Sequence, residues 1–484
     1  MAGRRDDGRT LIAVAVLASF VSFLDGSVVN LALPAISHEF GGGLTLQQWV
    51  LDGYLLALGA LILVAGAFSD SFGRRTVLRA GLGVFAVASL LCALAPSGAV
   101  LVAARCLQGL GAAFLVPSSL AMMNARFTGA EQARAIGIWT AWTGTAFVVG
   151  PLLGGVLVDA LNWRWIFAIN LVPLALTLFL TTRLEPEVSA DRNGAGGIDV
   201  VGALLTAFGL TGAVYALIEG QRLGFGDPVV LGSLAFGLVL LAVLPWWERR
   251  AKHPMVPPRI FVSRNFAVGN AATVFLYAGV SLGMLLVTLF LQETIGLSAL
   301  AAGLATLPIP VLSFLLAARF GALAGRHGPR LYMAAGPLVA ALGFLLMAGS
   351  APAAGNGFSF WLQMLPGLVL FALGLTATVS PLTATVLAAI DPAQSGIGSA
   401  INNAISRIAG LIAVAFISVI VGGASAWPGV PGFRQGMVVT AALFAAAGVV
   451  SAIGIRNVRP DLATIPPVVG AGSHDRPAPP PALR

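Results

Sequence analysis

The sequence predicts an all-α integral membrane protein with about fourteen transmembrane helices. Hydrophobic residues make up 58% of the 484 residues, and Asp, Glu, Lys and Arg together make up 10%. Charged residues account for roughly 25% of an average soluble domain. Apolar runs recur along the chain, each close to the ~20 residues that cross a bilayer core as a helix. This composition excludes a soluble enzyme, a secreted domain and a disordered protein.

The apolar runs fall into three sets. The first six cover about 10–34, 46–68, 76–95, 99–123, 133–157 and 165–182. Two more cover about 200–218 and 229–247, and the last six cover about 266–291, 299–320, 331–348, 358–389, 399–422 and 436–455. The twelfth run is long enough to bend at Pro366 or Pro381. The first run is too long for a cleaved signal peptide, carries Asp25 and lacks a small-residue cleavage site.

The basic residues orient the chain. If the N-terminus lies in the cytoplasm, Arg164, Arg222 and Arg434 are the only basic residues in outer connectors, and Arg105 and Arg407 lie inside runs. The rest of the 27 Lys and Arg residues fall in inner connectors or at the termini. This is the positive-inside pattern, so we expect both termini in the cytoplasm. It also explains the net charge of +8 without a nucleic-acid partner.

A short segment repeats weakly. The segment Gly66–Arg75 is matched later by Gly321–Arg330, with identities at Gly66, Gly73 and Arg75. Parallel repeats of this kind relate the two six-helix halves of one transporter architecture. We therefore expect an N-terminal six-helix bundle in 1–183, two linker transmembrane helices with a cytoplasmic connector in 184–265, a C-terminal six-helix bundle in 266–459, and a Pro-rich disordered cytoplasmic tail in 460–484.

Five motifs follow one another along the chain. They are Leu24–Pro34, Gly66–Arg75, Arg105–Ala113, Gly150–Gly155 and Ser395–Asn403. Together they resemble the major facilitator superfamily, and within it the fourteen-helix drug:proton antiporters. The resemblance implies a major facilitator fold of two six-helix bundles plus two additional central helices. It also implies a proton-coupled secondary active efflux transporter, which exports hydrophobic or amphipathic drugs or antibiotics across the bacterial inner membrane by alternating access.

The chain departs from this family at three positions. Gly26 stands where a Thr is common, and Asp52 stands where an uncharged residue is common. Gly325, in the second copy of the repeat, stands opposite the acidic Asp70 of the first.

Three charges are expected at similar depth in the outer half of the first bundle. At ~1.5 Å per residue, Asp25, Asp52 and Arg105 lie roughly 9–14 Å below the outer ends of their spans. Buried ionisable residues are costly and mark functional sites. We expect a proton-coupling site in which a carboxylate alternates between a proton and the Arg105 contact as the conformation changes. A fixed structural ion pair is the alternative, and an interfacial position is a further alternative for Asp52.

The resemblance implies a conformational latch on the cytoplasmic side. Its residues are Gly66, Asp70, Gly73, Arg74 and Arg75, whose charge interactions would hold one conformation and break during the cycle. Asp70 would favour a helix N-terminus of the other bundle, because that end is partially positive. The alternative is a turn whose arginines only set the topology.

The antiporter motif of the fifth span consists of Gly150, Pro151, Gly154 and Gly155. These residues predict a helix that bends and approaches its neighbours closely. An antiport role is implied by the resemblance, and packing alone is the alternative.

Several polar or aromatic side chains are candidates for the substrate cavity. They are Asn30, Gln108, Trp142, Asn402, Asn403 and Arg407. Arg407 lies in the inner half of its span and either contacts substrate or caps a loop. Trp142 either stacks on a planar compound together with Trp139 or belongs to an interfacial aromatic belt.

Other function classes lack their sequence signals. The single lysine, Lys252, has no glycine-rich context, so no phosphate-binding loop is expected. Cys92 and Cys106 are interpreted as packing cysteines, and the four histidines form no cluster with cysteines or carboxylates. We therefore expect no metal, no cofactor and no enzymatic activity.

The expected partners are a small-molecule substrate, protons and the lipid bilayer, with the chain acting as a monomer. A dedicated exporter of one endogenous metabolite is the main alternative function. A non-transporting membrane sensor is less favoured, because no connector is long enough for a soluble domain. One lysine among 27 basic residues hints at a GC-rich bacterial genome, and hence at a bacterial inner membrane.

The orientation is testable with reporter fusions. After Arg222, fused alkaline phosphatase is expected to be active and fused green fluorescent protein to be dark. Within 249–264 the opposite result is expected, because the positive-inside bias places the first connector outside and the second in the cytoplasm. Paired alkaline phosphatase and green fluorescent protein fusions measure this. A cytoplasmic signal at Arg222 would contradict the fourteen-span topology.

Overall fold

The structure, a computed structural model, describes residues 2–127, 129–184, 199–351, 357–391, 394–422, 427 and 429–457. Within these residues the chain is helical and contains no strand. Fourteen of the described segments are long and apolar enough to cross a membrane. The all-α membrane class and the number of spans predicted from the sequence are therefore confirmed. The predicted tail, 460–484, lies outside the described residues.

The first group of helices packs into one bundle. Its members are α1 (Ala2–Phe40), α2 (Gly43–Phe72), α3 (Arg74–Ala93), α4 (Gly98–Arg126), α5 (Gly129–Ala160), α6 (Trp165–Ala168) and α7 (Leu171–Thr182). α4 packs against both α2 and α3, and α1 packs against α5 and α4. We call this group the first bundle.

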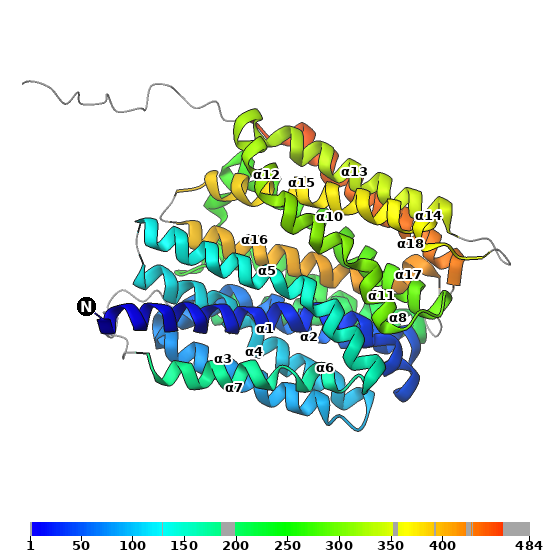
Figure 1. Cartoon of the computed structure of the whole chain (residues 1–484), viewed down its shortest axis with the longest axis horizontal. Coiled ribbons are helices and arrows are strands. Elements are labelled where there is room, and N and C mark those ends of the chain that lie inside the picture. The colour runs from blue at the N-terminus through cyan, green and yellow to red at the C-terminus, as the bar shows by residue number, and fades with distance from the viewer. Residues whose placement is uncertain are drawn as a thin grey trace, which may run out of the picture.

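The last group forms the second bundle. Its members are α10 (Arg264–Leu289), the π-helix η3 (Phe290–Thr294), α11 (Ala299–Thr306), α12 (Pro308–His327), α13 (Pro329–Ser350), α14 (Phe360–Gln363), α15 (Leu365–Ala388), α16 (Ser395–Ala415), α17 (Ile417–Val421) and α18 (Gly429–Gly454). α13 packs against α15 and α18, and α10 packs against α16 and α18. In Figure 1 the two bundles occupy the lower and upper parts of the view, with α5 and α16 between them.

Two helices lie between the bundles in sequence. They are α8 (Val200–Leu223) and α9 (Pro228–Glu248), followed by the short η2 (Pro258–Val262). α8 packs against α9, against α2 of the first bundle and against α16 and α17 of the second. The indole of Trp49 on α2 donates a hydrogen bond to Glu219 on α8 at 3.0 Å. The inserted pair therefore lies against the seam between the two bundles.

Several spans are broken. The expected bend in the twelfth span occurs at Met364. Pro366 is the second residue of α15, whereas Pro381 stays inside that helix. The tenth span breaks at Leu307, where Pro308 starts α12. The thirteenth breaks at Phe416, a break for which no proline or glycine gave a signal.

The weak sequence repeat has a structural counterpart. Gly73, between α2 and α3, and Gly328, between α12 and α13, both have φ of 88°, a backbone conformation that favours glycine. Arg75 donates to the carbonyl of Leu184, which follows α7, at 2.9 Å. Arg330 donates to the carbonyl of Ala452, near the end of α18, at 2.8 Å. In each copy an arginine thus ties the glycine turn to the end of its bundle's last helix.

The two bundles meet at the end where α1 leads into α2, which we call the α1–α2 end; the opposite end carries the N-terminus (Figure 1). There the carboxylate of Asp159, at the end of α5, accepts hydrogen bonds from the backbone amides of Ala299 and Leu300 at 3.0 and 2.9 Å. These amides open α11, so the carboxylate sits at a partially positive helix N-terminus.

Glycine allows the helix backbones to approach at this contact. A Cβ on Gly155 of α5 would lie 2.8 Å from the amide nitrogen of Leu300, and a Cβ on Gly303 of α11 would lie 2.5 Å from the carbonyl oxygen of Pro151. Real Cβ atoms essentially never come within 3.0 Å of such atoms. Close packing of α5 on α11 therefore requires both glycines.

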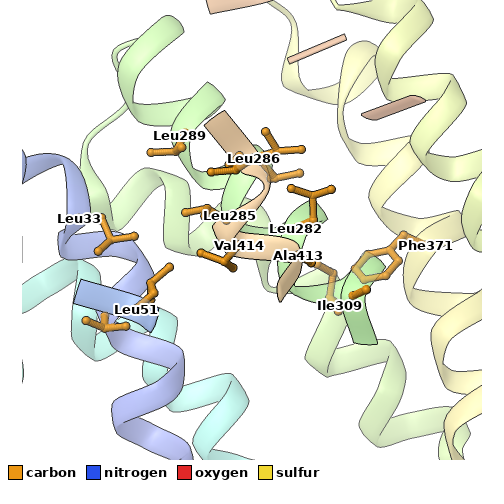
Figure 2. Close-up of a cluster of buried hydrophobic side chains, with 14 of the residues drawn as sticks. Leu33, Leu51, Leu282, Leu285, Leu286, Leu289, Ile309, Phe371, Ala413 and Val414 are labelled. Atoms are coloured by element: carbon orange, nitrogen blue, oxygen red, sulfur yellow. The ribbon is translucent and has the colours of Figure 1, made fainter. Parts of the chain in front are cut away.

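An apolar cluster continues across the boundary. It runs from Leu33 on α1 and Leu51 on α2, through Leu285 on α10 and Val414 on α16, to Phe371 on α15 (Figure 2). All five side chains are buried. The α1–α2 end is thus closed by shared hydrophobic packing as well as by the Asp159 cap.

Gly155→Val is expected to open the α1–α2 end, because its side chain clashes with the backbone of α11. In a Cys92→Ala, Cys106→Ala background, a cysteine at Asn30 should react faster with an impermeant maleimide supplied from the side of the α1–α2 end. Gly137→Val, on the same helix α5, is the control, since a Cβ at Gly137 has no neighbouring atom within 4 Å. Equal labelling of both variants would contradict the assigned contact.

Candidate functional site

A buried ion pair lies at the centre of the first bundle. Arg105 on α4 donates from Nη1 to Oδ2 of Asp25 on α1 at 2.7 Å. The side chains are 1% and 0% exposed, respectively, so neither charge reaches solvent. The sequence analysis expected these two residues to meet, and the structure brings them together.

Polar neighbours complete the coordination of this pair. Gln108 and Asn170 each donate to Oδ1 of Asp25 at 2.9 Å. Arg105 also donates from Nε to the carbonyl of Val50 at 3.0 Å and from Nη1 to Oε1 of Gln108 at 2.6 Å. Both carboxylate oxygens of Asp25 are therefore hydrogen-bonded, as a buried charge requires.

Local structure aligns these groups. Arg105 and Gln108 are three residues apart on α4, so they share one face of that helix. Asn170 lies where the sixth span breaks between α6 and α7. Gln108 donates as well to Ser89 of α3 at 2.9 Å. Gln108 was expected in the substrate cavity; it is instead fully buried beside Asp25. Asn170 was not among the expected site residues, although it follows the aromatic segment Trp163–Phe167 closely in the sequence.

Aromatic rings enclose the guanidinium of Arg105. Its central carbon lies 4.3 Å from the ring centroid of Tyr54 and 5.6 Å from that of Phe167. The Tyr54 hydroxyl is within 3.3 Å of Ser22 on α1. Such ring contacts stabilise a cation that has lost its water.

Asp52 has a contrasting environment. It lies on α2, nine residues after that helix begins at Gly43, and is 0% exposed. Neither of its carboxyl oxygens has a hydrogen-bond partner among the groups that the structure describes. An ionised carboxylate without partners is very costly in such surroundings, so this position favours a neutral acid.

Gln48 lies one helical turn before Asp52 and bridges the two bundles. Its side-chain amide donates to the carbonyls of Val414 and Ala415 at 3.0 and 2.9 Å, and its Oε1 accepts from Ser418 at 2.6 Å. These partners flank the break at Phe416, where the α16 ladder leaves carbonyls without helical partners. Positions four apart share a helix face, so Asp52 lies on the side of α2 that meets α16.

The latch motif is only partly described. Gly66 and Asp70 belong to the last turns of α2, and their side-chain surroundings lie outside the described residues. Gly73 makes the positive-φ turn, Arg74 begins α3, and Arg75 binds the carbonyl of Leu184.

The antiporter motif divides its residues between two neighbours. A Cβ on Gly154 would lie 3.2 Å from Cβ of Val28, and one on Gly150 would lie 2.9 Å from Cβ of Ser27, so both glycines pack on α1. Pro151 and Gly155 face α11. The motif therefore joins α1 to the second bundle at the closed end.

A set of side chains lies at the boundary between the bundles, on α1, α5 and α16. The ring of Phe23 on α1 lies 5.7 Å from that of Phe147 on α5 and 5.9 Å from the guanidinium carbon of Arg407 on α16. Asn30 is half-buried on the same face of α1 as Phe23. Trp142 does not join this set, because it is 60% exposed and lies on the face of α5 turned away from α11.

A polar cavity of about 130 Å³ lies within the second bundle, between α10, α15 and α16. Its polar lining comes from Tyr277, Thr383, Ser399, Asn402, Asn403 and Ser406. Asn402 donates to Asn270 and Thr273 of α10 at 3.1 and 2.9 Å, which fixes its side chain. The structure thus brings Asn402, Asn403 and Arg407 to one region. The described residues contain no group of three or more His, Cys, Asp or Glu side chains able to hold a metal ion.

The chain was compared with known proteins. Residues 15–414 match the family model of the Major Facilitator Superfamily. The chain is 35% identical to the puromycin resistance protein pur8 of Streptomyces alboniger, over 86% of this chain and 82% of that protein. It is 36% identical to the multidrug resistance protein Stp of Mycobacterium tuberculosis, over 86% and 76%. It is 33% identical to the cephamycin export protein CmcT of Amycolatopsis lactamdurans, over 85% of each chain.

Solved structures share the fold at low identity. A proton-dependent oligopeptide transporter structure superposes with a TM-score of 0.62 at 16% identity, over 92% of this chain and 96% of that one. The human organic anion transporter MFSD10 superposes with a TM-score of 0.61 at 16% identity, over 92% and 99%. The predicted fold class is therefore confirmed.

Arg105→Gln is expected to destabilise the chain strongly, by about 3–5 kcal/mol, because it leaves the buried Asp25 without its counter-charge. The double variant Asp25→Asn, Arg105→Gln should recover part of this loss. Thermal unfolding in detergent measures both. The control is Arg164→Gln, which removes a half-exposed pair with Glu39 worth at most about 1 kcal/mol. A double variant less stable than Arg105→Gln would contradict a compensated pair.

Proposed function

The chain belongs to the major facilitator superfamily, and we propose that it is an efflux transporter that exports small molecules from a bacterial cytoplasm in exchange for protons. It is a multi-pass membrane protein. Members of this superfamily move solutes and are not, in general, enzymes. The observation that carries the proposal is the contrast between two buried carboxyl groups, Asp25 and Asp52, described below.

The direction of transport rests on the relatives. Proteins named for puromycin resistance, multidrug resistance and cephamycin export cover most of the chain at 33–36% identity. A transporter that confers resistance or exports a compound moves that compound out of the cell. The export direction is thus proposed for this chain, along with its place in the bacterial inner membrane as a monomer surrounded by lipid.

We propose that the α1–α2 end faces the outside and that both termini lie in the cytoplasm. The positive-inside distribution supports this orientation. In this structure the Asp159 cap, the Gln48 bridge and the apolar cluster close the α1–α2 end. The structure would then represent the inward-facing conformation, which receives substrate from the cytoplasm. The α1–α2 end would be the closed outer gate.

Asp52 is proposed to carry the exchanged proton. Asp25 has its oxygens occupied by Arg105, Gln108 and Asn170, so protonating it would break a charge-assisted network. Asp52 has no such partners and lies on the face of α2 that packs on α16. A neutral Asp52 fits the dry contact, whereas an ionised one would require water or a separated α16.

This contrast supports a coupling cycle. A proton from the outside neutralises Asp52 and lets the outer gate close. When that proton leaves toward the cytoplasm, the charge on Asp52 destabilises the closed gate and favours opening with substrate bound. Asp25 and Arg105 are retained as the second proposed proton-coupling site, because a conformational change that separates them would expose a basic carboxylate.

A dedicated exporter of one endogenous metabolite is the second candidate function. Relatives named for cephamycin export and as a probable actinorhodin transporter favour it. Susceptibility of cells with and without the gene, over a chemically varied panel, separates the two. Protection against several unrelated compounds supports multidrug export, and protection against one compound class supports the dedicated exporter.

Asp52→Asn is expected to abolish uphill, pH-gradient-driven efflux in proteoliposomes, while downhill exchange of substrate continues. The amide keeps the size and neutrality of the protonated acid and cannot release a proton. Glu131→Gln, at an exposed position on α5, should retain wild-type coupling.

The outcome for Asp25→Asn locates the proton. Wild-type coupling in Asp52→Asn together with its loss in Asp25→Asn would move the site to the Asp25–Arg105 pair. Wild-type coupling in both variants and in the double variant would exclude a carboxylate mechanism in the first bundle.

A further inference from the structure

Arg407 is a half-buried cation at the boundary between the two bundles. It lies near the middle of α16, eight residues before that helix ends at Ala415, or about 12 Å along the axis. Its guanidinium carbon is 5.9 Å from the ring centroid of Phe23 on the opposite bundle. Its own Cβ lies 4.0 Å from the position that a Cβ on Gly59 of α2 would occupy. Arg407 therefore stands between α16, α1 and α2.

No carboxylate neutralises Arg407 within the described part of the chain, where none lies within ion-pair distance of it. Asp25 is already bound to Arg105 inside the first bundle. Asp52 is seven residues before Gly59 on α2, roughly 10 Å along the axis toward the closed end. A half-buried arginine that lacks an internal counter-charge is a binding site for an external anion, since guanidinium donors match carboxylate and similar oxygens.

Aromatic and polar groups surround this cation. Phe23 and Phe147 form a ring pair with centroids 5.7 Å apart, which provides an apolar surface for a planar ligand. On the other side, Asn403 is one helical turn from Arg407, and Ser406 precedes it directly. Both line the polar cavity with Tyr277. A ligand held here would place a ring against Phe23 and Phe147 and an anionic group on Arg407.

We propose that the region around Arg407, Phe23 and Phe147 binds amphipathic aromatic anions, with Arg407 holding the anionic group, in preference to aromatic cations. The inference rests on the proposed export function, whose substrate class it names. The structure gives a cation no comparable partner here. Asp25 is already bound by Arg105, Gln108 and Asn170, and Asp52 lies roughly 10 Å along α2 from Gly59, toward the closed end.

Three probes with one ring system test the charge preference. They are 9-anthracenecarboxylate, the neutral 9-anthracenecarboxamide and (9-anthracenylmethyl)trimethylammonium. Equilibrium dialysis against purified protein in lipid nanodiscs, with protein-free nanodiscs subtracted, measures their binding at neutral pH without a proton gradient. The wild-type protein is expected to bind the carboxylate more tightly than the amide, and the amide more tightly than the trimethylammonium compound.

Substitutions then assign the preference to one side chain. Arg407→Gln should weaken binding of the carboxylate roughly 10- to 100-fold, the range expected for losing hydrogen bonds to a charged group. It should leave binding of the amide within a factor of about two. Arg407→Lys should retain part of the carboxylate affinity, because the charge remains while the planar guanidinium donors are lost. Arg249→Gln, an exposed arginine of the connector after α9, controls for loss of net charge.

The outcomes are decisive for the inference. Tighter wild-type binding of the trimethylammonium probe than of the carboxylate overturns it, and this comparison needs no variant. An equal loss of carboxylate and amide binding in Arg407→Gln overturns it as well, because that pattern reports a structural role. Gradient-driven transport is measured separately in proteoliposomes. Selective binding without such transport would uphold the anion site and refute the proposed efflux function.

Discussion

The Asp25–Arg105 ion pair is the interaction on which the first bundle depends. A charge pair inside an apolar bundle is tolerated only when every oxygen and N–H has a partner. Here that requirement draws in Gln108 from α4, Ser89 from α3, Val50 from α2 and Asn170 from the break between α6 and α7. The network therefore ties most helices of the bundle to one centre. A bundle held in this way moves as a unit, so conformational change is expected at its boundary with the second bundle.

The boundary is built differently. Its polar links include Gln48, which binds the break in α16, Asp159, which caps α11, and His38, which lies 3.5 Å from Glu293 of η3. Neutral hydrogen bonds contribute about 0.5–1.5 kcal/mol each and those to a charged group about 1.5–3 kcal/mol, so such a contact can open and close. An uncompensated charge in a dry contact costs several kcal/mol. Ionising Asp52, one turn from Gln48, therefore costs enough free energy to decide whether this boundary stays closed.

The sequence predicted those features that depend on composition and local pattern. The spans followed from apolar length, the glycine turns at Gly73 and Gly328 from the repeat, and the embedded charges from their rarity. Features that depend on tertiary contacts were not predicted. Nothing local shows that Asn170 reaches Asp25, or that Gln48 meets carbonyls freed by a break at Phe416, because those partners lie in distant segments. Gln108 was assigned to the cavity because the sequence shows that it is polar. The sequence does not show which face of α4 packs toward Asp25.

The charge of the substrate changes the energetics of the proposed exchange. If a cation leaves while one proton enters, no net charge crosses the membrane, and only the pH gradient drives the cycle. If an anion held by Arg407 leaves while one proton enters, two positive charges in effect move inward. Each charge gains about 2.3 kcal/mol in a potential of 100 mV, so the potential supplies about 4.6 kcal/mol per cycle. Anion binding at Arg407 and proton binding at Asp52 are thus mutually consistent, because the membrane potential drives both the exit of the anion and the entry of the proton.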